Sequence, residues 1–190
     1  MTKLIAFSGS TRTESLNKKL IACAVTMFKE KGQEIEIINL AEYDLPIYNG
    51  DIEQSSFPDN VTKLYKKFKE ADGFVIASPE YNSSFSPLLK NVVDWVSRPQ
   101  NNEPSLTAFA GKTAMIIAAS MGPLGGIRGI YQLRWVLENI MMHVSPSIMA
   151  LPVAHEAFDE NGQIKEEKYK KMLESSVIKM IELTSKLVKP

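Results

Sequence analysis

Short runs of apolar residues alternate along this chain with segments in which apolar residues recur every three or four positions. The apolar runs cover residues 4–7, 35–40, 74–77, 113–119 and 144–148. Each run has the length of a β-strand, and most have no polar face, which predicts strands that are buried on both sides. The helical pattern covers residues 15–31, 60–71, 88–96, 131–141 and 166–187.

Buried strands joined by helices are typical of a parallel sheet with helices on both faces. Right-handed crossovers then produce a three-layer α/β sandwich. Five strands match a flavodoxin-like sheet with strand order 2-1-3-4-5 better than the six-stranded dinucleotide fold. We therefore predict one flavodoxin-like domain that spans residues 1–190. The longer segments 42–58 and 98–111 read as loops within this domain.

The charge balance excludes some classes of partner. Lysine plus arginine and aspartate plus glutamate number 22 each, so nothing favours nucleic acid or an anionic membrane. The single cysteine, Cys23, cannot form an internal disulfide and is interpreted as a small buried hydrophobe. The apolar run after Lys3 is too short for a signal peptide, and no run approaches the ~18 residues of a membrane span. We expect a cytoplasmic protein.

The loop after the first predicted strand has the chemistry of an anion site. It leads directly into a helix, whose first N–H groups have no partner inside the helix and whose dipole favours negative charge. The polar groups are the hydroxyls of Ser8, Ser10, Thr11 and Ser15, the Asn17 amide and the Arg12 guanidinium. This set suits a phosphate monoester. A helix N-cap beside a surface arginine is the alternative interpretation.

Two further loops follow the third and fourth predicted strands. In residues 78–85, Pro79 stiffens the turn, Tyr81 offers an aromatic face and Asn82 offers hydrogen bonds, which suits a flat heteroaromatic ring. In residues 120–128, Gly122 and Gly125 permit close approach of the backbone to a ligand. A solvated turn and a tight connection are the respective alternatives. Because ligands bind at the carboxyl ends of parallel strands, the three loops together predict one site.

Three motifs connect the chain to a known family: Gly9-Ser10-x-Arg12-x-x-Ser15-x-Asn17, Pro79-Glu80-Tyr81-Asn82 and Lys90-Asn91-x-x-Asp94-Trp95. With these motifs, residues 3–150 resemble the NADPH-dependent FMN reductase family of flavodoxin-like quinone, azo-dye and chromate reductases. The resemblance implies FMN-phosphate contacts from Ser10, Arg12, Ser15 and Asn17, ring contacts from Pro79, Glu80, Tyr81, Asn82 and Ser83, and contacts on the other side from Ser120, Gly122 and Gly125. The chain departs from the family pattern at Ser83, where many members have glycine, and at Ser86-Pro87, which replaces a common Pro-Gly.

The resemblance also implies an activity. Bound FMN would accept a hydride from NADPH or NADH and reduce quinones, azo or nitro compounds, oxidised metals or free flavin by a ping-pong mechanism. The flavin carries this chemistry, so we expect no catalytic side chain, and Glu80 is expected to be structural or cofactor-positioning. His143 and His155 lie outside the three loops and are assigned no role. No metal site is expected, because no His, Cys or Asp cluster has ligand spacing.

Two alternatives remain for the function, and two for the assembly. A flavodoxin-like electron carrier would normally be strongly acidic, whereas this chain is neutral; a flavin-binding regulatory module without turnover is the other alternative. The helical segments 88–96 and 131–142 are apolar on more than one side, which fits either deep burial within one chain or a subunit interface. The family resemblance implies a homodimer, often doubled to a homotetramer.

Overall fold

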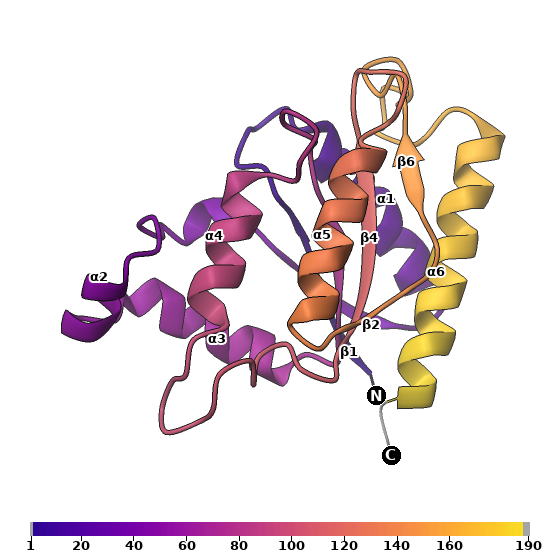
Figure 1. Ribbon diagram of the computed structural model, residues 1–190. Helices are drawn as coiled ribbons and strands as arrows, with labels where there is room; N and C mark the ends of the chain where they lie inside the picture. The colour runs from indigo at the N-terminus through magenta and orange to yellow at the C-terminus, as the bar shows by residue number, and fades with distance from the viewer. Residues whose placement is uncertain (1, 188–190) are drawn as a thin grey trace.

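The protein is a parallel β-sheet between two layers of helices, and the prediction of a flavodoxin-like three-layer sandwich is confirmed (Figure 1). The computed structural model describes residues 2–187. The strands are β1 (Lys3–Ser8), β2 (Glu34–Ile38), β3 (Gly73–Ala77), β4 (Thr113–Ala119), β5 (His143–Val144) and β6 (Met149–Leu151). Their order is β2-β1-β3-β4-β5, β6 also pairs with β4, and every pairing is parallel.

Helices cover both faces of the sheet. The helices are α1 (Leu16–Glu30), α2 (Gly50–Ser55), α3 (Asp59–Glu70), α4 (Pro87–Val96), α5 (Ile127–Asn139) and α6 (Glu167–Leu187), and one 3₁₀ turn covers Leu40–Glu42. Successive side chains of a strand point to opposite faces. In β1, Leu4 and Ala6 therefore pack with α1 and α6, while Ile5 and Phe7 pack with α3, α4 and α5. This double burial explains the fully apolar strands.

The predicted fifth strand, residues 144–148, is wrong in its bounds. The structure has two short strands instead: β5, which overlaps this stretch only at Val144, and β6, which follows it. Pro146 lies in the interruption and has no N–H group to donate to β4. Ser145 still donates its N–H to the Ala114 carbonyl at 2.7 Å, so the chain continues beside β4 up to the proline.

One helix was not predicted from the sequence, and another begins earlier than predicted. Helix α2 lies within the predicted loop 42–58; it buries no residue, so no apolar periodicity could mark it. Helix α5 begins four residues earlier than predicted, directly after Gly126, whose φ of 92° is in the left-handed region. Cys23 is buried as predicted, and burial raises the pKa of its thiol.

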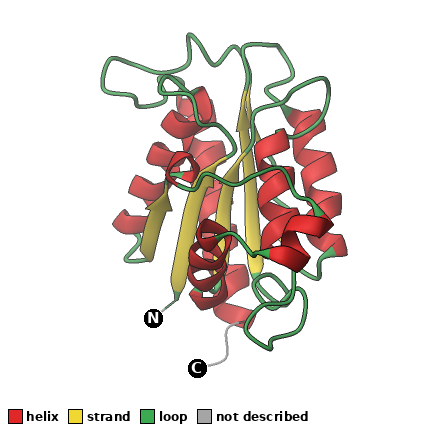
Figure 2. Cartoon of the chain, turned by 90° about the vertical axis from the view of Figure 1, so that its left-hand side faces the viewer, coloured by secondary structure: helices red, strands yellow, loops and turns green. Residues whose placement is uncertain are grey.

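The topology determines where a ligand can bind. From β1 the chain crosses to β2 on one side and then returns to β3 on the other side, so the strand order reverses between β1 and β3. The loops that follow the strands gather at one end of the sheet, at the top of Figure 2. Open parallel sheets bind ligands at this switch point.

Candidate functional site

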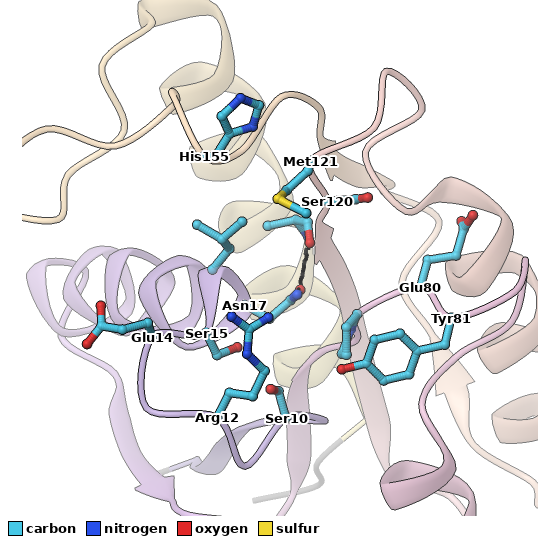
Figure 3. Close-up of a pocket in the computed structure, with 13 residues that line it drawn as sticks. Ser10, Arg12, Glu14, Ser15, Asn17, Glu80, Tyr81, Ser120, Met121 and His155 are labelled. Atoms are coloured by element: carbon cyan, nitrogen blue, oxygen red, sulfur yellow. Dashed lines mark hydrogen bonds between the residues drawn. The ribbon is translucent and has the colours of Figure 1, made fainter.

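A cavity of about 330 Å³ opens where the loops after β1, β3 and β4 meet (Figure 3). Its lining residues are Ser10, Arg12, Glu14, Ser15, Leu16, Asn17, Pro79, Glu80, Tyr81, Ala119, Ser120, Met121 and His155. The structure thus brings together eight of the twelve site residues expected from the sequence. The other four are Asn82, Ser83, Gly122 and Gly125, which lie outside the lining.

The N-terminus of α1 forms one wall of the cavity. Ser15 is the N-cap, and its Oγ accepts the Lys18 N–H at 3.3 Å. Within residues 2–187, the N–H groups of Leu16 and Asn17 donate to no protein acceptor. Arg12 makes no ion pair in the same range, and its guanidinium points into the cavity in Figure 3. This corner therefore offers a cation and free N–H donors to an anion.

Asn17 has a structural task that the sequence did not reveal. Its Nδ2 donates to the Ala119 carbonyl at 2.9 Å, and its Oδ1 accepts the Ala119 N–H at 2.9 Å. These bonds tie the first turn of α1 to the end of β4. An amide has two N–H groups and two lone pairs, so one of each remains for a ligand.

The loop after β3 is a tight two-residue turn. Tyr81 and Ser84 exchange both of their backbone hydrogen bonds, at 2.9 and 3.0 Å. Asn82 and Ser83 between them have φ values of 50° and 66°, which is the pattern of a type I′ turn. The turn holds Tyr81 at the cavity, whereas Asn82 lines a neighbouring depression beside α4 and α5.

Glu80 connects this loop to α5. Its Oε2 accepts the N–H groups of Arg128 and Gly129 at 3.0 and 3.2 Å, and its Oε1 accepts from the Arg128 guanidinium. Burial by itself raises the pKa of the Glu80 carboxyl, but these hydrogen bonds outweigh that effect and hold the pKa below its ordinary value. The carboxylate therefore caps the N-terminus of α5. This contact is consistent with the structural role expected for Glu80.

The glycines of the third loop serve the fold rather than the cavity wall. Gly125 has a φ of 63°, and a Cβ at this position would lie 2.8 Å from the backbone of Ala150 in β6. Gly122 donates its N–H to the Ser120 Oγ at 3.3 Å. Gly125 therefore has a packing role, its expected contact with a ligand stays a prediction, and Ser120 provides the polar group at the cavity.

His155 lies outside the three loops, as the sequence indicates, but it nevertheless lines the cavity. The segment after β6 is tied to the third loop, because Ala154 donates its N–H to the Ser120 carbonyl at 3.0 Å. Val153 has a φ of 45°, a strained value for a β-branched residue, and His155 follows it at the cavity rim (Figure 3). No sequence motif marks this approach, since it depends on tertiary contact alone.

Two negative findings concern residues 2–187. They contain no group of three His, Cys, Asp or Glu side chains that could hold a metal ion. No helix in the same range is long and apolar enough to cross a membrane.

Comparisons with known proteins show the family of this chain. Residues 2–156 match the model of the NADPH-dependent FMN reductase family. The chain belongs to this family. It is therefore an oxidoreductase of the class that works with FMN and NAD(P)H.

Relatives of this FMN reductase family are similar along nearly their whole length. An NAD(P)H-dependent FMN reductase of Pseudomonas aeruginosa is 32% identical over 92% of this chain and 91% of its own. An NAD(P)H:quinone oxidoreductase of Solanum tuberosum is 34% identical over 97% and 94%. The solved structure of a flavoenzyme NAD(P)H:(acceptor) oxidoreductase from Paracoccus denitrificans has a TM-score of 0.84 at 26% identity, covering 98% of this chain and 99% of that one.

Proposed function

We propose that this protein binds FMN in the 330 Å³ cavity and passes electrons from NADPH or NADH to small acceptors such as quinones. The observation that carries the proposal is the position of Arg12, Ser10 and Ser15 at the N-terminus of α1, at the switch point of the sheet. Bound FMN supplies a ring that accepts a hydride and releases electrons, so no side chain needs to act as acid or base.

The residues present fit the phosphate of FMN. The free N–H groups of Leu16 and Asn17 and the guanidinium of Arg12 are donors of the kind that a phosphate accepts from. Ser10 and Ser15 are both more than nine-tenths buried, so their hydroxyls are held in place before a ligand arrives. We assign the phosphate to Ser10, Arg12, Ser15 and Asn17.

The other two loops fit a flat ring. Pro79 and Tyr81 form one wall, and Ser120 forms the opposite side, where its Oγ accepts the Gly122 N–H. Glu80 holds the first wall in place through α5, while Asn82 and Ser83 shape the turn. Gly125 contributes by letting the third loop pack on β6.

Both substrates would reach the bound ring through this cavity in turn, as in a ping-pong mechanism. Quinones are the acceptors we favour, because several relatives are named quinone reductases. Azo and nitro compounds, oxidised metals and free flavin are further acceptors that an open site would accommodate. A reducing, cytoplasmic location suits the nicotinamide supply and the lone buried Cys23.

We also propose that two copies associate through α5. The apolar excess on α4 is absorbed within the chain, where Trp95 is fully buried and its Nε1 donates to the Pro46 carbonyl at 2.7 Å. On α5, by contrast, Tyr131 is 53% exposed and Trp135 is 75% exposed, one turn apart. Trp135 also lines the depression beside Tyr81, so a second copy there would adjoin the cavity.

One experiment tests the enzyme against the two alternatives. The purified protein is mixed with FMN, NADPH is added without oxygen, and a quinone follows, with the visible spectrum recorded throughout. Bleaching by NADPH and repeated reoxidation by the quinone are expected. A flavin that NADPH does not reduce would favour an electron carrier. Failure to bind FMN would refute the assignment of the cavity.

A further inference from the structure

A second cavity lies behind the phosphate-binding loop, on the α1 side of the sheet. It has a volume of about 220 Å³ and lies between α1 and the carboxyl ends of β1 and β2. Its lining residues are Ser8, Lys18, Ile21, Ile37, Ile38, Asn39 and Leu40. It shares no lining residue with the 330 Å³ cavity. An apolar cavity of about 150 Å³ holds a benzene molecule, so this space admits a ring with a small substituent.

A buried hydroxyl in this cavity has no partner. Ser8 is 6% exposed, and its Oγ makes no hydrogen bond within the described residues. Ser8 follows Leu4 and Ala6 at the two-residue spacing of a strand, so it points to the same face of β1, toward α1. In the sequence, the Ser8 hydroxyl is one of the polar groups of the loop that suits a phosphate, but Ser8 does not line the 330 Å³ cavity. Leaving a buried donor unpaired is unfavourable unless a ligand completes it.

A cation lines the same cavity as this hydroxyl. Lys18 extends from α1 and donates its Nζ to the Thr11 carbonyl at 3.2 Å. It makes no ion pair within residues 2–187; the Glu36 carboxylate of β2 lies on the opposite face of the sheet, where it is bonded to Lys67 of α3. An ammonium has three N–H groups, so Lys18 can keep the Thr11 bond and still donate to a ligand.

The rest of the wall is apolar, and part of it is uncovered. Ile37 is 51% exposed on β2, which is an edge strand of the sheet. Ile21 and Leu40 close the inner side. The Asn39 amide is bonded within its own turn, where its Oδ1 accepts the Ala41 N–H and its Nδ2 donates to Glu42, so one N–H and one lone pair remain. A water molecule would find few polar partners here, whereas an apolar group would cover the isoleucines.

We propose that this cavity is a binding site for a small monocarboxylate with an apolar body about the size of a benzene ring. The carboxylate accepts hydrogen bonds from the Ser8 hydroxyl and the Lys18 ammonium, and the apolar body contacts Ile21 and Ile37. The site is separate from the proposed FMN site and does not depend on it.

Benzoate is the probe for this proposal. It is titrated into the purified full-length protein with FMN added, and the isoleucine methyl groups are followed by NMR. We expect saturable shifts at Ile21 and Ile37 with no change in the visible flavin spectrum. Benzyl alcohol, which has the same ring but no charge, should bind at least about tenfold more weakly, since a charge-assisted hydrogen bond is lost. Absence of saturable binding, or equal binding of the alcohol, would overturn the proposal.

Three variants locate the ligand. Lys18→Met should weaken benzoate about tenfold, while the matched variant Lys19→Met, whose cation lies near Glu14 on the same helix, should leave the affinity unchanged. Ile37→Trp fills the mouth from an exposed position that tolerates a larger side chain and should abolish binding. Ser8→Ala should weaken binding yet raise the melting temperature, because it removes an unpaired buried hydroxyl. Unaltered binding to Ile37→Trp would place benzoate elsewhere and refute the site.

Discussion

The polar residues at the 330 Å³ cavity are of two kinds. Some have no protein partner within the described residues and are free to bind a ligand, and others are bonded to neighbouring elements and hold the loops in place. Arg12 has no protein partner among residues 2–187 and is free to meet an anion, whereas Glu80 is fully engaged by α5. Both look equally polar in the sequence. The two residues differ because only Glu80 has hydrogen-bond donors from α5 beside it. Replacing Arg12 should therefore affect ligand binding, whereas replacing Glu80 should affect stability.

Replacing Arg12 with alanine should weaken FMN binding. A charge-assisted contact to phosphate contributes about 1.5–3 kcal/mol, or roughly 10–150-fold in the dissociation constant. Calorimetric titration of the apoprotein with FMN measures this change. Lys19→Ala is the control, since Lys19 is a cation of the same helix outside the cavity lining. Unchanged FMN affinity in Arg12→Ala would remove Arg12 from the phosphate site.

Replacing Glu80 with glutamine should destabilise the fold but preserve turnover when FMN is bound. The side chain is 7% exposed and accepts from a guanidinium and two N–H groups, so loss of its charge should cost about 1–3 kcal/mol of unfolding free energy. Urea unfolding and a quinone assay measure the two effects. Glu138→Gln, which alters a half-exposed ion pair at the other end of α5, should cost less than about 1 kcal/mol. An inactive Glu80→Gln protein that retains FMN would make Glu80 catalytic.

At the scale of elements, the turn after β3 contains residues with unfavourable backbone angles. The turn between Tyr81 and Ser84 needs two consecutive residues with positive φ, and the protein uses Asn82 and Ser83 there. Asparagine tolerates this region well, but serine does not, and a type I′ turn favours glycine at its second position. The departure from the family pattern at Ser83 is therefore also a local conformational cost.

Ser83→Gly should raise the free energy of unfolding by up to about 1 kcal/mol, because it relieves this cost. The Ser83 carbonyl, which accepts from Gln132 at 2.7 Å, is retained in the variant. Thermal unfolding detects the change as a higher melting temperature. Ser84→Gly is the matched control: its φ is not positive, so it should lower the melting temperature. A destabilised Ser83→Gly protein would contradict this account of the turn.

Lys112 links the end of α3 to the sheet and should make stability depend on pH. Its Nζ donates to the carbonyls of Phe68 and Lys69, at 2.6 and 2.5 Å, and burial lowers its pKa from 10.5 to about 8. Between these values the unfolded chain binds more protons than the folded one, so this residue's contribution to stability increases as the pH rises. The neutral amine still has two N–H groups for the two carbonyls.

The measurement is a comparison of urea unfolding for the wild type and Lys112→Met at pH 7.5 and at pH 10. The difference in unfolding free energy should shift in favour of the wild type at the higher pH. Other titrating groups are common to both proteins and cancel. A shift in favour of Lys112→Met would show that the folded-state pKa of Lys112 is not depressed.

At the scale of the whole molecule, the sheet and its two helical layers leave a face of α5 uncovered. Tyr131 and Trp135 are exposed there, although aromatic side chains are usually found in cores or interfaces. This face adjoins the depression that Trp135 lines. Tyr81 lines both this depression and the 330 Å³ cavity. The proposed second copy would therefore lie next to the site for FMN.

Trp135→Glu should convert a dimer into monomers, because it places a charge at the centre of the proposed contact. Sedimentation velocity at working concentration measures the assembly. Ile178→Glu introduces the same charge at an exposed apolar residue of α6 and should leave the dimer intact. A wild-type protein that sediments as a monomer would refute the interface.

Most of the fold and of the site's chemistry could be predicted from local patterns. Strands such as β3 and β4 are buried on both faces and so appear as uninterrupted apolar runs. The loop 8–17 carries its hydroxyls and Arg12 within a few residues of a helix start, and that chemistry is visible in any window of the sequence. Helix α2 could not be predicted, because it buries nothing and so leaves no periodic signal.

The sequence by itself determined the succession of buried strands and helices and the anion-binding chemistry of the first loop, because both depend on residues that are close together in the chain. Only the tertiary structure decided that the Asn17 amide is bonded to Ala119, 102 residues away, and that His155 reaches the cavity. It alone placed Ser8 in the lining of a second cavity and outside the lining of the 330 Å³ cavity. These outcomes depend on which distant segments meet across the sheet, and no local pattern encodes that.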